Sequence, residues 1–140
     1  MLYFDVNYLS VLAGGVVSII LGSLWYSPLL FGKIWMRCMG IKPEDCKPNP
    51  KGMWKSYSLT FLGSLVMAYV LNALIWATGA GTLSAALFLA LVLWVGLLAT
   101  TGMSEYLFTP EKKPWTLYLI NTGYQLTQML LIAAVAVWLI

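Results

Sequence analysis

The sequence predicts an all-α integral membrane protein, a bundle of four transmembrane helices with a short interfacial helix after the first span. Three observations support this fold class. The 140-residue chain is 61% hydrophobic and only 9% charged, whereas charged residues make up roughly a quarter of a typical soluble domain. The apolar residues fall into four long runs. The basic residues are confined to two of the three connecting loops.

The apolar runs set the expected spans, and we expect residues 1–140 to form a single transmembrane domain. The runs are Tyr8 to Phe31, Tyr57 to Gly79, Thr82 to Phe108 and Trp115 to Ile140. Each exceeds the roughly 20 residues that a helix needs to cross about 30 Å of hydrocarbon. Because lipid offers no hydrogen bonds to the backbone, a helix is the expected form of every run. A soluble bundle would carry a polar stripe on each helix, and these runs lack charges apart from Glu105.

The loop of residues 32–56 is the longest expected connection. Its segment from Lys33 to Met39 mixes basic with large apolar side chains, which predicts a short amphipathic helix at the membrane interface. Three prolines after Gly40 disfavour a continuous helix there, so we expect a flexible connector up to Tyr57. These prolines are Pro43, Pro48 and Pro50.

The distribution of charge predicts the orientation. Six of the eight basic residues lie in the 32–56 loop, and the other two are Lys112 and Lys113. The turn from Gly79 to Thr82 and the segment before Tyr8 carry none. Because lysine and arginine near span ends are retained on the cytoplasmic side, we expect a cell-membrane protein with both termini outside and the 32–56 loop in the cytoplasm. The N-terminal segment also lacks the positive region of a cleaved signal peptide.

Aromatic residues gather at both expected interfaces. The expected inner set is Trp25, Tyr26, Trp35, Trp54, Tyr57, Tyr106 and Trp115, and the outer set is Tyr3, Tyr8, Trp76 and Trp138. Tryptophan and tyrosine belts of this kind are typical of transmembrane bundles. They explain most of the tryptophan content without a ligand.

Small residues recur every four positions in the first two spans. The series are Ser10, Gly14, Ser18 and Gly22, and Thr60, Ser64, Ala68 and Asn72. Positions i and i+4 lie on one helix face, so each series lets another backbone approach closely. The faces could pack against each other or form a dimer seam. Packing within one chain is favoured because four spans must bury these faces somewhere.

A polar face is predicted on the fourth span, where Asn121, Gln125 and Gln128 follow Tyr118 at spacings of three and four. Carboxamides facing lipid are costly, so this face should look into the protein or a wet cavity. Counted from Tyr57 and Trp115 at about 1.5 Å per residue, Asn72 and Gln128 lie at similar depths. We therefore expect a hydrogen bond between these two side chains.

Glu105 is the acidic residue of the spans, about one turn from the inner end of the third. Counting residues places it near the depth of Asn121. Its carboxylate could exchange a proton or meet a cationic ligand in a shared cavity. The favoured alternative is a side chain that extends to the interface and accepts a hydrogen bond from Lys112, Lys113 or a tyrosine.

Several classes of function are disfavoured. The chain has no histidine and only Cys38 and Cys46 as thiols, too few ligands for a zinc or haem site within one chain, so we expect no metal and no cofactor. Without a paired base or a glycine-rich phosphate loop, we do not expect an enzyme. The dispersed lysines form no compact surface for nucleic acid. Both cysteines should be free thiols in a reducing compartment.

The stretch from Gly22 to Met36, GSLWYSPLLFGKIWM, closely resembles the signature of a small membrane family known as domain of unknown function 1761. In that family a glycine and a Trp-Tyr pair, here Trp25 and Tyr26, end the first span. The turn from Phe108 to Trp115 and the region of Tyr124 and Gln125 resemble its second half. The resemblance implies a four-span bundle without an established activity.

A weak internal similarity accompanies this motif. The residues that close the first span are Ser23, Tyr26, Phe31, Lys33 and Trp35, and those that close the third are Ser104, Tyr106, Phe108, Lys112 or Lys113, and Trp115. Two hairpins of one orientation would be typical of a parallel-repeat transporter. The favoured alternative is that every inner interface collects aromatic and basic residues.

Two functions are consistent with these observations. The first is binding or transport of a small polar or amphipathic solute by a homo-oligomer. The expected ligand-binding residues are Asn72, Glu105, Asn121, Gln125, Gln128, Trp25 and Tyr26. The second is a non-catalytic accessory or assembly subunit of a larger membrane complex, in which the polar face only specifies helix pairing. In both cases membrane lipids surround the protein.

Overall fold

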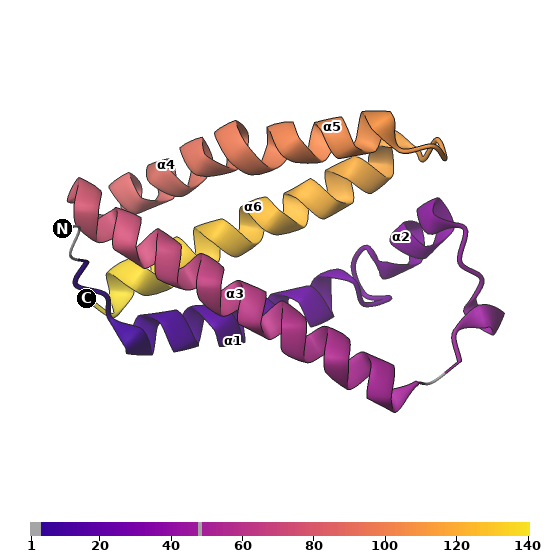
Figure 1. Cartoon of the computed structure of the whole chain (residues 1–140), viewed down its shortest axis with the longest axis horizontal. Helices are drawn as coiled ribbons and strands as arrows, with labels where there is room; N and C mark the ends of the chain where they lie inside the picture. The colour runs from indigo at the N-terminus through magenta and orange to yellow at the C-terminus, as the bar shows by residue number, and fades with distance from the viewer. Residues whose placement is uncertain (1–3, 48) are drawn as a thin grey trace.

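The computed structural model describes residues 4–47 and 49–140, so Tyr3 and Pro48 lie outside the described part. The described chain is helical and contains no strand (Figure 1). Its α-helices are α1 (Tyr8–Trp25), α2 (Gly32–Met39), α3 (Pro50–Thr78), α4 (Leu83–Leu93), α5 (Thr100–Phe108) and α6 (Trp115–Trp138). A 3-10 turn, η1 (Pro43–Asp45), precedes α3, and a π-helical segment, η2 (Trp94–Ala99), joins α4 to α5. Four helical stretches are long and apolar enough to cross a membrane, which confirms the predicted four-span bundle.

The first span ends earlier than predicted. α1 begins at Tyr8, where the Asn7 side chain accepts hydrogen bonds from two backbone N–H groups, but it stops at Trp25 rather than Phe31. A proline disfavours helical conformation in the residue before it, so Pro28 ends the helix. Residues 26–31 form a tight turn in which the Gly32 N–H donates to the Ser27 carbonyl at 2.9 Å. The turn sends the chain into the predicted interfacial helix α2, which is present and ends at Gly40 (φ 71°).

The second span begins earlier than predicted. Pro50 is the first residue of α3, whereas the prolines were expected to keep the chain irregular up to Tyr57. The expectation was wrong because proline is well tolerated in the first turn of a helix, where its missing N–H would have had no partner. The preceding Asn49 caps the helix by accepting from the Gly52 N–H at 3.2 Å.

The third span contains a π-helical segment that is attached to α6 by two hydrogen bonds. The Trp94 indole donates to the Thr122 carbonyl at 2.9 Å, and the Tyr118 hydroxyl donates to the Ala99 carbonyl at 2.7 Å. A π-helical turn changes the backbone hydrogen-bond pattern, so Tyr118 of α6 can bond to the Ala99 carbonyl, whereas the Trp94 bond runs from the π-helical segment to a carbonyl of α6.

The faces of small residues pack against each other within the chain. The Ser10 hydroxyl donates to the side-chain oxygen of Asn72 at 2.9 Å, which joins α1 to α3. One turn further along, a Cβ added to Gly14 would lie 3.0 Å from the Cβ of Ala68 and 3.5 Å from Ile132 of α6. The two series thus pack within the chain, as the intramolecular interpretation predicts, except at Thr60, which is exposed.

α6 lies between the other spans, with α1 and α3 on one side and α4 to α5 on the other (Figure 1). α3 is strongly inclined to its neighbours. It lies beside α6 near the chain termini and crosses α1 on its way to the opposite end. That opposite end, which holds residues 26–47, Asn49 and residues 109–114, carries most of the lysines and is called the basic end below.

Candidate functional site

Gln128 and Asn72 each pair with a serine rather than with each other. Gln128 Nε2 donates to the Ser64 hydroxyl at 3.2 Å, whereas Asn72 accepts from Ser10 and donates to the Ala68 carbonyl at 2.8 Å. The expected bond between Asn72 and Gln128 is therefore wrong. Asn72 instead lies near the chain termini, where it borders a cavity of about 410 Å³ together with Asp5.

The error has a geometric cause. The depth of α3 residues was counted from Tyr57, but the helix starts seven residues earlier, at Pro50. Counted from that start, Ser64 is about 21 Å along α3, and Gln128 is about 20 Å along α6. Ser64 and Gln128, which are bonded, therefore lie at nearly equal distances from the ends of α3 and α6 that face the basic end.

The pair of Ser64 and Gln128 also marks where α3 leaves α6. No hydrogen bond joins α3 to α6 nearer the basic end within the part of the chain that the structure describes. From Met53 to Thr60 every side chain of α3 is exposed, and Trp54 is 75% exposed. Toward the basic end, α3 thus no longer covers the polar face of α6.

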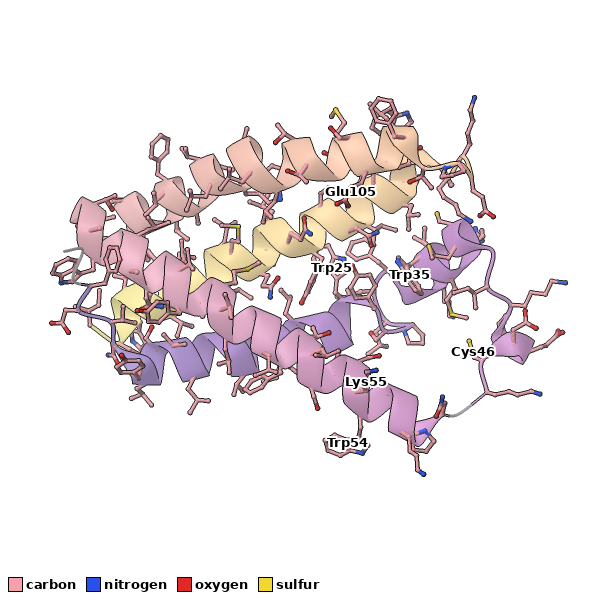
Figure 2. All side chains as sticks on the ribbon, viewed as in Figure 1. Trp25, Trp35, Cys46, Trp54, Lys55 and Glu105 are labelled. Atoms are coloured by element: carbon pink, nitrogen blue, oxygen red, sulfur yellow. The ribbon has the colours of Figure 1, made fainter. Side chains whose placement is uncertain are left out.

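A cluster of aromatic rings lies at this uncovered part of α6 (Figure 2). We define the aromatic cluster as Trp25, Tyr26, Phe31, Trp35 and Tyr124. The ring of Tyr26 lies 5.6 Å from Trp35 and 5.4 Å from Tyr124, and Trp25 lies 4.7 Å from Phe31. The cluster joins the end of α1, the interfacial helix α2 and the middle of α6.

Two polar contacts fix the aromatic cluster on α6. The Tyr26 hydroxyl donates to the side-chain oxygen of Asn121 at 3.0 Å, and the Trp25 indole donates to the Ile120 carbonyl at 3.1 Å. The Trp-Tyr pair that ends the first span therefore contacts the polar face of the fourth. Three of the residues expected to bind a ligand are brought together in this way.

Gln125 lies between the two bonded carboxamides of α6. It is half-buried, and among the described residues nothing forms a hydrogen bond with its side chain. It is one turn from Asn121 and one turn from Gln128, so it belongs to the same face. An unpaired carboxamide beside the aromatic cluster can bind a polar group of a ligand.

Glu105 occupies a different setting. Its residue is exposed, and its carboxylate has no ion pair or hydrogen bond within the described ranges. Lys113 pairs instead with Glu111 at 3.2 Å, and the Tyr106 hydroxyl donates to the Lys113 carbonyl. The hydrogen bond expected between Glu105 and a lysine or tyrosine is therefore not formed.

The internal similarity has a structural counterpart. Tyr106 lies 4.7 Å from Trp115, nine residues later, as Tyr26 lies 5.6 Å from Trp35. The tyrosine hydroxyls have different partners, however, because Tyr106 bonds within its own hairpin and Tyr26 bonds to α6.

Two features of the site were missed at the level of sequence. Tyr124 packs over Gly22, where an added Cβ would lie 3.2 Å from the tyrosine hydroxyl, and the fixed spacing of Gly22 in the small-residue series was the signal that could have indicated it. An apolar groove between α1 and α3, with a volume of about 660 Å³, was not indicated by any motif.

The fold and these contacts define a small polytopic membrane protein with a polar and aromatic site at one end of its bundle. The chain belongs to the family described as a protein of unknown function, DUF1761, whose family model matches residues 9–137. It is also similar to a UPF0591 membrane protein of Schizosaccharomyces pombe, with 33% identity over 92 residues. That alignment covers 64% of this chain and 61% of the yeast protein, so the chain spans less than two thirds of this relative. No solved structure matches the chain.

Proposed function

We propose that this membrane protein binds a small amphipathic molecule at the basic end of the bundle, between the aromatic cluster and Gln125. The observation that carries the proposal is the change in packing along α6. Toward the chain termini its polar face is covered by α3 through the contact of Gln128 with Ser64, and toward the basic end α3 leaves it. This packing supports binding of the molecule from the basic end better than its transport through the whole bundle.

The chemistry of the site fits a ligand with an apolar body and a polar group. Aromatic rings supply a large apolar surface, while a carboxamide supplies both a donor and an acceptor. An unpaired carboxamide at membrane depth is costly unless a polar partner satisfies it. Because carboxamides orient ligands rather than move protons, we propose binding rather than catalysis.

The same proposal includes an orientation. With the lysines retained inside, the basic end faces the cytoplasm, both termini lie outside the cell membrane, and the site is entered from the cytoplasmic side. Cys46 is exposed in the loop before α3, so it is a native probe. In intact cells a membrane-impermeant maleimide should leave Cys46 unlabelled, and should label it after permeabilisation. Labelling of intact cells would reverse the orientation.

A second copy of the chain is also part of the proposal. The third span packs mainly on α6 and is the least buried of the four spans. A homo-oligomer would cover more of this span. Cross-linking in native membranes should give a discrete oligomer, and a monomer at all cross-linker concentrations would contradict this part of the proposal.

Accessibility of single cysteines tests whether the site is open. In full-length protein carrying Cys38→Ser and Cys46→Ser, Gln125→Cys should react with a water-soluble maleimide, and Gln128→Cys, whose native side chain is buried, should not. Equal protection of both positions would overturn the proposed opening. Equal reactivity would instead indicate a pathway that extends toward the middle of the bundle.

Native mass spectrometry tests for the ligand itself. Protein purified in mild detergent should carry a small molecule that is reduced at least several-fold by Gln125→Leu. Thr116→Val is the matched control, because Thr116 also lies on α6 but is exposed. If neither wild-type protein nor the control carries a small molecule, or if both variants retain it equally, the site does not bind as proposed.

The accessory subunit is the second candidate function. It is favoured by the observation that Asn72, Asn121 and Gln128 all form hydrogen bonds between helices, as expected if polar residues serve helix pairing. A stoichiometric partner protein after purification in gentle detergent would support this role, whereas a homo-oligomer without such a partner would support ligand binding.

A further inference from the structure

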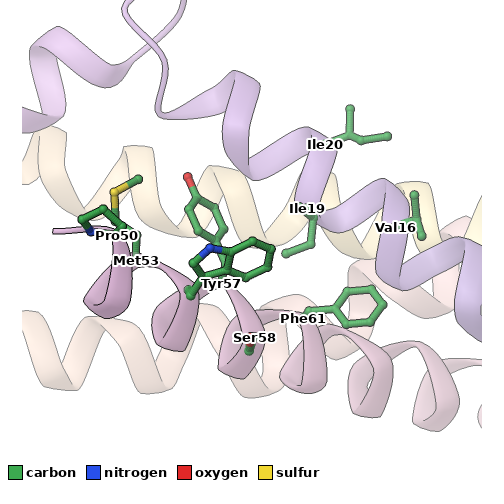
Figure 3. Close-up of a pocket in the computed structure, with 9 residues that line it drawn as sticks. Val16, Ile19, Ile20, Pro50, Met53, Tyr57, Ser58 and Phe61 are labelled. Atoms are coloured by element: carbon green, nitrogen blue, oxygen red, sulfur yellow. The ribbon is translucent and has the colours of Figure 1, made fainter. Parts of the chain in front are cut away.

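The cavity near the chain termini differs in charge from the groove between α1 and α3. The groove is lined by uncharged side chains such as Ile19, Tyr57 and Phe61 (Figure 3). The cavity near the termini holds about 410 Å³, and its lining includes the carboxylate of Asp5 and the carboxamide of Asn72. Cavities of this size accommodate small organic ligands. This one lies at the opposite end of the bundle from the basic end.

Asp5 gives the cavity a negative charge without a counter-ion. It is the only charged side chain among residues 1–32, and residues 56–104 and 114–140 have none. Within the described residues its carboxylate forms no ion pair and no hydrogen bond. All lysines and the arginine lie in residues 33–55 or 112–113, toward the basic end. A cation bound at Asp5 would therefore meet no competing side-chain cation.

Two helices have their C-terminal ends at the cavity. Gly79 directly follows α3 and Ile140 lies just after α6, and both belong to the lining. Helix C-termini carry a partial negative charge, which adds to the charge of Asp5. The positive N-termini of α1 and α4 lie at the same end, but the side chains of Asn7 and Thr82 accept hydrogen bonds from N–H groups of their first turns. The electrostatic potential in the cavity therefore favours a cation.

The remaining wall is apolar and aromatic, which suits an organic cation. Ile75 and Trp76 of α3 belong to the lining, and tryptophan is the side chain whose ring face attracts cations most strongly. The ring of Phe4 lies 6.3 Å from the ring of Trp76, so the segment that carries Asp5 is held against this tryptophan. A single carboxylate offers too few oxygen ligands for a divalent metal ion.

Asn72 supplies hydrogen-bonding groups deeper in the cavity. It lies two turns before Gly79, about 10 Å from the end of α3, and is only 7% exposed. Its oxygen accepts from Ser10 and its nitrogen donates to the Ala68 carbonyl. A carboxamide has two N–H groups and two lone pairs, so one of each remains for a ligand.

We propose that this cavity binds a small organic amine in its protonated form, with the ammonium group between Asp5 and Trp76 and the apolar body along Ile75. The ammonium group donates a charge-assisted hydrogen bond to the carboxylate and is attracted by the indole ring. A hydrogen-bonding group on the same ligand can pair with Asn72. The site does not depend on ligand binding at Gln125.

Binding of phenethylamine to the full-length protein in phosphatidylcholine nanodiscs tests the proposal. Near neutral pH this amine is protonated, as a lysine side chain is. Equilibrium dialysis should show one molecule bound per chain above the amount in empty nanodiscs. Asp5→Asn should weaken this binding about fivefold, and Trp76→Leu about two- to fivefold. Phenylethanol, which keeps the apolar body without the charge, should bind wild-type protein several-fold more weakly than phenethylamine.

Two matched variants serve as controls. Asp45→Asn makes the same substitution at an exposed residue of the basic end, and Trp138→Leu does so at an exposed residue that ends α6 outside the cavity lining. Both should bind phenethylamine as wild-type protein does. Equal losses in the control and cavity variants would indicate diffuse attraction of the amine and overturn the proposal. Equal binding of phenylethanol and phenethylamine, or no binding above empty nanodiscs, would overturn it as well.

Discussion

The Tyr26 hydroxyl donates a hydrogen bond of 3.0 Å to the side-chain oxygen of Asn121, and this bond joins the end of the first span to the polar face of the fourth. It holds the Tyr26 ring between Trp35 and Tyr124. The bond therefore links helix packing to the shape of the candidate binding site.

Removing this hydroxyl should weaken the bundle modestly. Tyr26→Phe is expected to lower the free energy of unfolding by about 1 kcal/mol, the usual contribution of one hydrogen bond. Combined with Asn121→Ala, it should cost less than the sum of the two single changes, because both remove the same bond. Thermal unfolding in detergent measures the cycle. Tyr69→Phe is the control, since Tyr69 is exposed and no described residue bonds to its hydroxyl. Additive effects would show that the bond contributes nothing.

The two glutamines of α6 should differ in their effect on stability. Gln128→Leu breaks a buried contact and leaves the Ser64 hydroxyl without that partner, so we expect a loss of about 0.6 to 2 kcal/mol. Gln125→Leu breaks no described bond and should leave the unfolding temperature unchanged or slightly raised. A larger loss of stability from Gln125→Leu than from Gln128→Leu would assign a structural role to Gln125.

The contact between α1 and α3 leaves no room at Gly14. Gly14→Val would push its side chain into Ala68 and Ile132, and overpacking of this kind typically costs about 1 to 3 kcal/mol. Gly63→Val is the matched control in a span, because an added Cβ at Gly63 meets nothing within 4 Å. Unfolding in increasing sodium dodecyl sulfate compares the two variants. Similar transitions for both would contradict the close packing of α1 on α3.

The fold was predictable because hydropathy reports directly on length and burial in lipid, and four apolar runs leave few alternatives to a four-helix bundle. Helix ends were less predictable. Pro28 stops a helix inside an apolar run, where hydropathy alone continues it, and Pro50 starts a helix inside a polar loop. The predicted end of α1 and the predicted start of α3 were wrong for the same reason. The effect of a proline depends on its position relative to the helix, and average hydropathy does not report that position.

The face of the site was predictable, but its partners were not. Spacings of three and four place Asn121, Gln125 and Gln128 on one side of α6, and the first and last of these side chains contact other helices. Which residue meets which depends on where each helix starts and how it is inclined. The error of seven residues at the start of α3 was enough to pair Gln128 with Asn72 instead of Ser64.

The turn after the first span should not accept any side chain at Gly32. An added Cβ there would contact the Tyr26 carbonyl oxygen and lie 2.7 Å from the Ser27 carbonyl oxygen. These are backbone atoms that hold the turn closed, since the Gly32 N–H donates to the same Ser27 carbonyl. Gly32→Ala must therefore shift the turn, and with it the contact between Tyr26 and Trp35. We expect a loss of about 2 kcal/mol and a changed near-ultraviolet circular dichroism signal from the aromatic cluster. Gly81→Ala, in the turn at the opposite end, has open space around its Cβ and should leave both measurements unchanged. An unaltered aromatic signal in Gly32→Ala would show that the turn does not position the cluster.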